Sequence, residues 1–288
     1  MRPKVCPCNG GKPVSLSSAT FAFLARMVRD HSAIVLDESK AYLVECRLGH
    51  LVHSEGVRDI DELAFRLRHD RFGPLRRKFL DAMTNNETWF FRDLYPFEAL
   101  RTTILPQILQ RPETDKTLSV WSAACSSGQE IYSVAMLIRE NFPSLLNWKL
   151  NLLGTDVSEA ILDRARAGVY SQLEVNRGLP TDLLARYFLQ TGAEWILKKD
   201  VREMACFRSL NLSVPLPPVG PFDIVFLRNV LIYFSLETRR EILARVRQVL
   251  RPGGVFFLGS AETTLNLDDS YECVPFQRSY YYQPKPPR

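Results

Sequence analysis

The sequence predicts an α/β fold, in which a mainly parallel sheet domain follows a small N-terminal all-α domain and carries an inserted β-hairpin subdomain. From residue 117 onward, apolar strand-like runs alternate with amphipathic helical stretches, a pattern typical of parallel sheets with helices on both faces. Residues 17–92 show only helix-period apolar stripes, whereas residues 186–208 have the pattern of short strands and turns. A chain of 288 residues is long enough for two modest domains.

Residues 1–16 are expected to form a flexible N-terminal tail. Cys6 and Cys8 have the wrong spacing for a zinc site and no second pair nearby, so no metal site is expected. The segment lacks the apolar stretch of a secretory signal, and no apolar run approaches the roughly 18 residues that span a bilayer. The six scattered cysteines indicate reduced thiols. We therefore expect a cytoplasmic protein without membrane insertion.

Residues 17–92 are expected to form a small helical domain of four helices. A serine cap precedes the first apolar stripe, the second helix runs from Asp37 to a C-cap at Gly56, and Pro74 can open the fourth. The apolar stripes of the first, third and fourth helices are Phe21, Leu24 and Val28; Ile60, Leu63, Ala64 and Leu67; and Leu75, Phe79 and Met83. Short helices with short connections predict a small bundle.

The sheet domain is predicted to span residues 93–288, and the insertion about residues 186–208. Its strand-like runs are "TLSVWSAAC", "KLNLLGTD", "FDIVFL" and "GGVFFLGSAE", and a helical stretch follows each of the first three. In an open sheet of this kind, ligands bind at the carboxyl ends of the strands.

The charge is weakly positive and unevenly distributed. The chain has a net charge of +5, and residues 1–92 hold 15 Lys and Arg against 11 Asp and Glu. This excess is too small to predict nucleic-acid binding. It suits a weakly acidic partner for the helical domain, and it equally suits a solvated helical surface.

Several common chemistries lack their central residues. All four histidines (His31, His50, His53 and His69) precede the sheet domain, which argues against a histidine-based triad or a histidine-ligated zinc there. The nucleophile elbow, the phosphate loop and the three-glycine dinucleotide fingerprint are also missing. The sequence therefore argues against a hydrolase, an ATPase and a dehydrogenase.

The segment "WSAACSSGQEIYS" (121–133) predicts a strand, a loop of small residues and a helix, with only one glycine, Gly128, in the loop. Enzymes that use S-adenosyl-L-methionine remain as a large class for this topology, because a cofactor without a pyrophosphate has less need of a glycine triplet. Asp156, at the end of the second strand, can accept hydrogen bonds from ribose hydroxyls. Glu130, at the start of the helix, can hold the cofactor's ammonium or its ribose. Both carboxylates could instead be helix caps.

Five ordered blocks of the sequence resemble the CheR family of chemotaxis receptor methyltransferases. The blocks are "AMTNNETWFFRD" (82–93), "VWSAACSSGQEIYSVAM" (120–136), "LLGTDVSEAILDRARAGVYS" (152–171), "FDIVFLRNVLIYF" (222–234) and "LRPGGVFFLGSAET" (250–263). The combination of the first and fourth blocks is the most specific part. The resemblance runs from about residue 17 to residue 282. It implies a Rossmann-like S-adenosylmethionine-dependent methyltransferase domain behind a helical domain.

The resemblance also implies roles for individual residues. It places the catalytic pair Arg92 and Tyr233 beside the reacting carboxylate. The cofactor-binding residues that it implies are Asn86, Thr88, Arg92, Glu130, Asp156, Asn211, Leu212, Arg228 and Asn229. The alternative interpretations are that Tyr233 is a core aromatic residue and that Arg92 belongs to a structural ion pair.

The family's reaction moves a methyl group from S-adenosylmethionine to glutamate side chains of a chemoreceptor, which gives methyl esters and S-adenosyl-L-homocysteine. A carboxylate is already a nucleophile at neutral pH, so no general base is required. The partner implied is the cytoplasmic coiled coil of a receptor, and the enzyme is expected to be a monomer. A methyltransferase with another substrate and a non-catalytic cofactor-binding regulatory module are the alternatives.

Two stretches depart from the best-known members of the family. The second helix contains "RLGHLVHSEG", with His50 and His53 where more arginine is typical. The insertion has a short loop with a single glycine, Gly192, so it resembles the members that do not dock a receptor's C-terminal tail.

Overall fold

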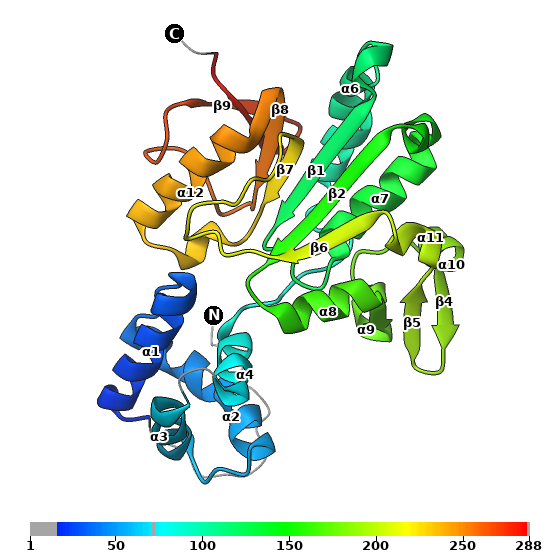
Figure 1. The fold of residues 1–288 in the computed structure, drawn as a ribbon. Coiled ribbons are helices and arrows are strands. Elements are labelled where there is room, and N and C mark those ends of the chain that lie inside the picture. Colours follow the sequence, from blue (N-terminus) through cyan, green and yellow to red (C-terminus); the bar gives the residue numbers. More distant parts are fainter. Residues whose placement is uncertain (1–15, 71–72, 287–288) are drawn as a thin grey trace. The chain divides into compact units, whose positions relative to one another are not determined.

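The computed structural model describes residues 16–70 and 73–286 (Figure 1). The predicted tail and its Cys6 and Cys8 lie outside the described residues, apart from Leu16. The chain divides into two compact units, residues 1–85 and 86–288. The predicted boundary lay at residue 92, so segment 86–92 groups with the second unit instead of the first.

The first unit is the predicted helical bundle. Its helices are α1 (Ser18–Ser32), the 3-10 turn η1 (Glu38–Lys40), α2 (Ala41–Ser54), α3 (Ile60–His69) and α4 (Pro74–Met83). Ser17 and Asp59 cap α1 and α3 by accepting hydrogen bonds from backbone N–H groups, and Pro74 opens α4. The apolar stripes predicted from the sequence form one core, in which Leu24, Leu48 and Phe79 are fully buried. Amphipathic periodicity therefore accounts for this unit.

The second unit is built on a seven-stranded sheet in the order β6-β2-β1-β7-β8-β10-β9. The strands are β1 (Thr117–Ala123), β2 (Lys149–Asp156), β6 (Ala205–Ser209), β7 (Phe222–Leu227), β8 (Leu250–Leu258), β9 (Tyr271–Phe276) and β10 (Ser279–Pro284). The first five in sheet order are parallel, and the terminal hairpin of β9 and β10 pairs antiparallel to β8. The α/β class with a mainly parallel sheet is thus confirmed.

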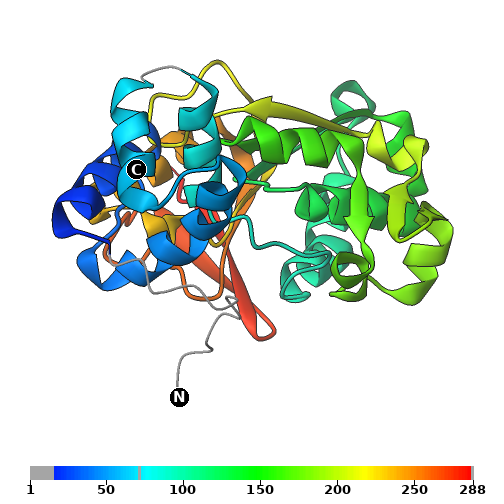
Figure 2. The ribbon, with the colours of Figure 1, turned by 90° about the horizontal axis from the view of Figure 1, so that it is seen from below.

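Helices cover both faces of this sheet (Figures 1 and 2). On one face, α6 (Leu105–Ile108), α7 (Gln129–Asn141) and α8 (Glu159–Ala167) share a core with Val120, Ile224 and Phe226. On the other face lies α12 (Leu236–Val249), where the Leu243 carbonyl accepts a hydrogen bond from the Tyr271 hydroxyl. The double cover explains why every residue of β7 and the last four residues of β1 are buried.

The insertion is a three-stranded antiparallel sheet in the order β3-β5-β4. Its strands are β3 (Val169–Ser171), β4 (Phe188–Thr191) and β5 (Glu194–Leu197), and α9 (Gln172–Asn176) and α10 (Thr181–Tyr187) connect β3 to β4. The predicted hairpin is present as β4 and β5. The structure differs from the predicted range, 186–208, at both ends, because β3 joins the insertion and β6 pairs with β2 in the main sheet. A half-exposed edge strand such as "ACFRS" has the same sequence pattern as a hairpin strand.

The remaining elements are short connections. They are α5 (Tyr95–Ala99), the π-helical turn η2 (Leu100–Ile104), α11 (Lys199–Arg202), and the 3-10 turns η3 (Glu113–Asp115), η4 (Pro143–Asn147) and η5 (Leu231–Tyr233). Within residues 16–70 and 73–286, no helix is long and apolar enough to cross a membrane.

Candidate active site

The loop between β1 and α7 turns sharply at the carboxyl edge of the sheet. Ala124 and Ser126 have positive φ values of 58° and 51°, and Gly128 has a φ of 88° and caps α7. A Cβ atom at Gly128 would lie 3.1 Å from the Tyr132 ring, so both the backbone conformation and the packing require glycine there. Non-glycine residues in this conformation are strained, and such strain is common at functional sites.

Asp156 holds this loop to the end of β2. One carboxylate oxygen accepts a hydrogen bond from the Ser126 backbone N–H at 2.9 Å, and the other accepts one from the Ser158 backbone N–H at 3.1 Å. The side chain is buried. Two backbone donors fix the orientation of the carboxylate at the end of β2.

Cys125 lies in the same loop and is not a nucleophile. Burial, followed by the charges of Asp156 and Glu130, raises the pKa of its thiol well above the ordinary value. The thiol therefore stays protonated at neutral pH.

Arg228, directly after β7, is the centre of a buried ion-pair network. Only 1% of its side chain is exposed. Its guanidinium donates to the Glu130 carboxylate at 2.8 Å, to the Asp93 carboxylate at 2.5 Å and to the Arg92 carbonyl at 2.9 Å. The Ser122 hydroxyl donates to the second oxygen of Glu130 at 2.7 Å. The network fixes the Glu130 carboxylate beside the small-residue loop.

Segment 86–92 is attached to the sheet unit at three points. The Asn86 carbonyl accepts a hydrogen bond from the Ser126 hydroxyl, the Phe91 N–H donates to Ser133 Oγ, and the Arg92 carbonyl is held by Arg228. Thr88 lies between the first two of these attachments. Three predicted site residues thus reach the carboxyl ends of β1 and β7 from a segment outside the sheet.

The Trp89 ring lies between two guanidiniums. The Cζ atoms of Arg92 and Arg177 stand 4.2 Å and 3.8 Å from its centroid. Arg92 also donates to the Glu87 carbonyl, and Arg177 pairs with the Glu87 carboxylate. The Arg92 Nε is buried without a hydrogen-bond partner among the residues described, as are the Nε atoms of Arg228 and Arg251.

The other predicted residues follow β6 and β7. Asn211 Oδ1 accepts hydrogen bonds from the backbone N–H and the hydroxyl of Ser213, and Leu212 is buried. The Leu210 N–H donates to the Asp156 carbonyl, which ties this segment to β2. Asn229 has a φ of 58°, and Tyr233 ends η5 and is half-buried.

Sequence reasoning missed three functional supports. Glu262 accepts backbone hydrogen bonds from Asn229, Ile232 and Gly259, and so fixes the turn before Tyr233. Its presence in the block "GSAET" was the available signal. Arg177 had no local signal, because its partner Glu87 lies 90 residues away. Asp93 ends the block "AMTNNETWFFRD", but its partner Arg228 lies 135 residues away and leaves no local pattern.

The fold and site define a class. The strand ends of the parallel sheet hold two fixed carboxylates beside a loop of small residues that lacks a glycine triplet. This is the arrangement of a Rossmann-like S-adenosylmethionine-dependent methyltransferase. The carboxylates suit a ligand that carries an ammonium group and ribose hydroxyls.

Family models identify the chain more closely. One described as "CheR methyltransferase, SAM binding domain" matches residues 86–280, and one described as "CheR methyltransferase, all-alpha domain" matches residues 19–84. This chain belongs to the CheR methyltransferase family. The predictions of the family, of a methyltransferase and of S-adenosylmethionine as methyl donor are confirmed.

Curated relatives match over nearly the whole chain. Chemotaxis protein methyltransferase 1 of Pseudomonas aeruginosa is 41% identical over 94% of this chain and 100% of its own length. Chemotaxis protein methyltransferase Cher2 of Pseudomonas putida is 42% identical over 88% of this chain and 93% of its own. A solved glycopeptide N-methyltransferase, MtfA complexed with sinefungin, is 17% identical with a TM-score of 0.35, over 61% of this chain and 52% of that chain. A TM-score this low supports no conclusion.

Proposed function

We propose that the chain acts in the cytoplasm and methylates glutamate side chains of a chemoreceptor, forming methyl esters for sensory adaptation and releasing S-adenosylhomocysteine. The observation that carries the proposal is the 41% identity to a chemotaxis protein methyltransferase over 94% of the chain. The confinement of all four histidines to the helical unit supports it, because a glutamate carboxylate needs no general base.

We assign the cofactor to the loop between β1 and α7. Asp156 accepts the ribose hydroxyls, Glu130 holds the ammonium or the ribose, and Asn211 with Leu212 borders the adenine. Asn86, Thr88, Arg92, Arg228 and Asn229 complete the predicted set. Because the Arg228 side chain is buried on Glu130 and Asp93, its proposed contribution is to position Glu130.

The cofactor supplies an electrophilic methyl group on a sulfonium sulfur. Arg92 binds the substrate carboxylate through its charged guanidinium, whose fork of N–H donors matches a carboxylate. The Trp89 ring keeps the guanidinium in one plane, which reduces the freedom lost when the carboxylate binds. Tyr233 fixes the approach angle through its hydroxyl. The enzyme's main task is therefore alignment, together with exclusion of water around charges that cancel on transfer.

The proposed partner is the cytoplasmic coiled coil of a receptor, contacted by a monomer of this chain. The relatives' printed names support a chemotaxis substrate. The weak positive excess of residues 1–92 suits an acidic partner. The β4–β5 turn contains only the short Gly192 loop, which supports a receptor bound without tail docking.

The test is methyl transfer from labelled S-adenosylmethionine to receptors of the same organism. We expect label on receptor glutamates that mild base releases as methanol. We expect Arg92→Ala to lower kcat/KM for transfer by about a hundredfold or more, because its charged hydrogen bonds to the carboxylate are lost. Arg278→Glu, at the exposed β9–β10 turn, is the control. Base-stable label would favour another substrate class, and tight cofactor binding without transfer to any substrate would favour a regulatory module.

A further inference from the structure

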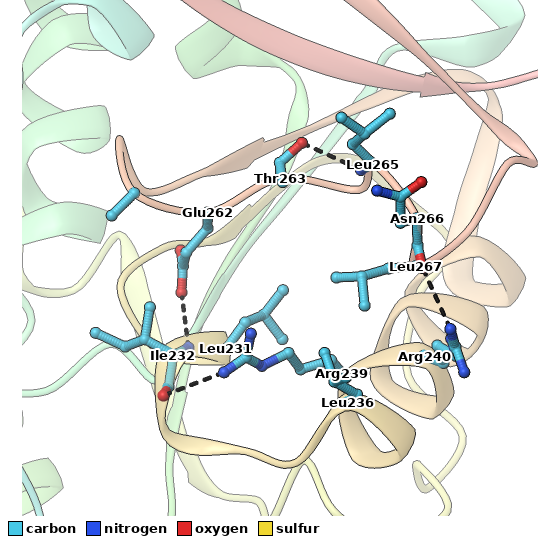
Figure 3. Close-up of a pocket in the computed structure, with 11 residues that line it drawn as sticks. Leu231, Ile232, Leu236, Arg239, Arg240, Glu262, Thr263, Leu265, Asn266 and Leu267 are labelled. Carbon is cyan, nitrogen blue, oxygen red and sulfur yellow. Dashed lines mark hydrogen bonds between the residues drawn. The ribbon is translucent and has the colours of Figure 1, made fainter.

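A hollow of about 310 Å³ lies beside the segment that carries Tyr233 (Figure 3). Its walls come from η5, from the first turns of α12 and from the segment that follows β8. Ile232, in the wall, directly precedes Tyr233, and Glu262, also in the wall, fixes the turn at Asn229. The hollow therefore adjoins the carboxyl ends of β7 and β8, next to the proposed reacting centre.

The rim of the hollow is apolar and exposed. Leu265 is 70% exposed, Leu236 is 59% exposed and Ile232 is 42% exposed. Three exposed aliphatic side chains around one concavity form a patch of the kind that marks interaction sites.

The charge that the hollow offers to a partner is positive. Arg239 donates to the carbonyls of Ile232 and Phe234, and Arg240 donates to the carbonyl of Asn266. Neither arginine forms an ion pair with a carboxylate among the residues that the structure describes. Glu262, the carboxylate in the wall, already accepts three backbone N–H groups. Two cations therefore stand against one carboxylate in the wall, and the hollow carries a net positive charge.

We propose that this hollow docks the receptor segment that flanks the modified glutamate. The inference rests on the proposed function. On a helix, residues three or four positions from a glutamate lie on the same face. An apolar side chain at such a position enters the hollow, and a neighbouring carboxylate pairs with Arg239 or Arg240. The occupant is an acidic helical segment with one apolar side chain within about a turn of the reacting glutamate.

The test measures binding of a fluorescently labelled receptor coiled-coil fragment by anisotropy, with S-adenosylhomocysteine present. We expect Arg240→Glu and Leu265→Asp each to weaken binding about tenfold, as for peripheral members of a docking surface. The matched controls are Arg278→Glu and Leu173→Asp, both exposed and on other elements. We expect the controls to bind the fragment like the wild type. Affinity for S-adenosylhomocysteine should stay unchanged in all four variants. In the two hollow variants, KM for the receptor should rise without a change in kcat.

The outcomes separate this inference from the proposed function. Unchanged fragment binding in both hollow variants overturns the docking inference and leaves the proposed receptor methylation standing. A wild type that does not bind the fragment has the same two consequences. A shift from dimer to monomer in sedimentation of Leu265→Asp also overturns it, because the hollow would then be a self-contact. A wild type that binds the fragment but methylates no glutamate refutes the proposed function, and the anisotropy comparison still decides the docking surface.

Discussion

Strand β7 carries a buried ion-pair cluster at each end, and the two clusters differ in design. At the amino end the centre is an anion: Asp223, 1% exposed, accepts from Arg111 at 2.5 Å, lies 3.6 Å from Arg251 and accepts from the Ser119 N–H at 2.7 Å. At the carboxyl end the centre is a cation, Arg228, and its carboxylate partners are more exposed, Glu130 at 12% and Asp93 at 36%. The amino-end cluster buries its central charge, whereas the carboxyl-end cluster has carboxylate partners that are partly exposed beside the proposed site.

Backbone strain follows the same division. Around the carboxyl end, positive φ values fall on Gly128 and also on six non-glycine residues: Phe91, Asp93, Leu94, Ala124, Ser126 and Asn229. Around the amino ends of β7 and β8, they fall on Gly220 and Gly253, where glycine adopts them without strain. The carboxyl end therefore holds backbone strain that its contacts must offset, as is common at functional sites.

The largest effect should follow from removing the cation at the functional end. Arg228→Met leaves Glu130 and Asp93 without their buried partner, so we expect the free energy of unfolding to fall by about 3 kcal/mol. We also expect affinity for S-adenosylhomocysteine to fall about a hundredfold, because Glu130 loses its orientation. Denaturant titration and calorimetry measure the two quantities. A variant that binds S-adenosylhomocysteine like the wild type would remove Arg228 from the site.

The matching change at the structural end should separate stability from binding. Asp223→Asn leaves Arg111 and Arg251 without their central anion and should also cost about 3 kcal/mol of unfolding free energy. Affinity for S-adenosylhomocysteine should stay within about twofold of the wild type. Asp163→Asn, which breaks an exposed pair with Arg166, is the control and should cost less than about 1 kcal/mol. Equal binding losses in Asp223→Asn and Arg228→Met would contradict the proposed division.

Much of the fold could be predicted from the sequence, because strands covered on both faces give long apolar runs that end where the chain leaves the sheet. The ends of β1, β2 and β7 placed Glu130, Asp156 and Arg228 at one edge. The contacts that these residues make could not be predicted, since they join positions up to 136 residues apart and leave no local pattern. The membership of β6 in the main sheet was missed for a similar reason, because parallel pairing with β2 is a long-range property.

Strain can be tested with a pair of glycine substitutions. Gly220→Ala should lower the free energy of unfolding by about 2 kcal/mol, because Gly220 has a φ of 90° and its Cβ would lie 3.0 Å from the Val249 carbonyl oxygen. Ala124→Gly should stay within about 0.5 kcal/mol of the wild type, since released strain offsets the added freedom of the unfolded chain. Thermal or denaturant unfolding measures both. A loss at Ala124→Gly as large as that at Gly220→Ala would show that Ala124 is not strained.

The smallest expected effect concerns Cys125. Because burial and neighbouring carboxylates raise the pKa of its thiol, the thiolate is scarce in the folded protein at pH 8. Mass spectrometry after brief iodoacetamide treatment should show Cys46, Cys206 and Cys273, which are exposed, modified before Cys125. Modification of Cys125 at the rate of the exposed cysteines would show that the loop opens readily.

A crystal structure of the chain with S-adenosylhomocysteine would decide where the reaction takes place. We expect the ribose hydroxyls on the Asp156 carboxylate, the amino-acid end beside Glu130, and the sulfur facing Arg92 and Tyr233. S-adenosylhomocysteine bound away from the carboxyl ends of β1 and β2, or with its sulfur turned from Arg92 and Tyr233, would contradict the assignment.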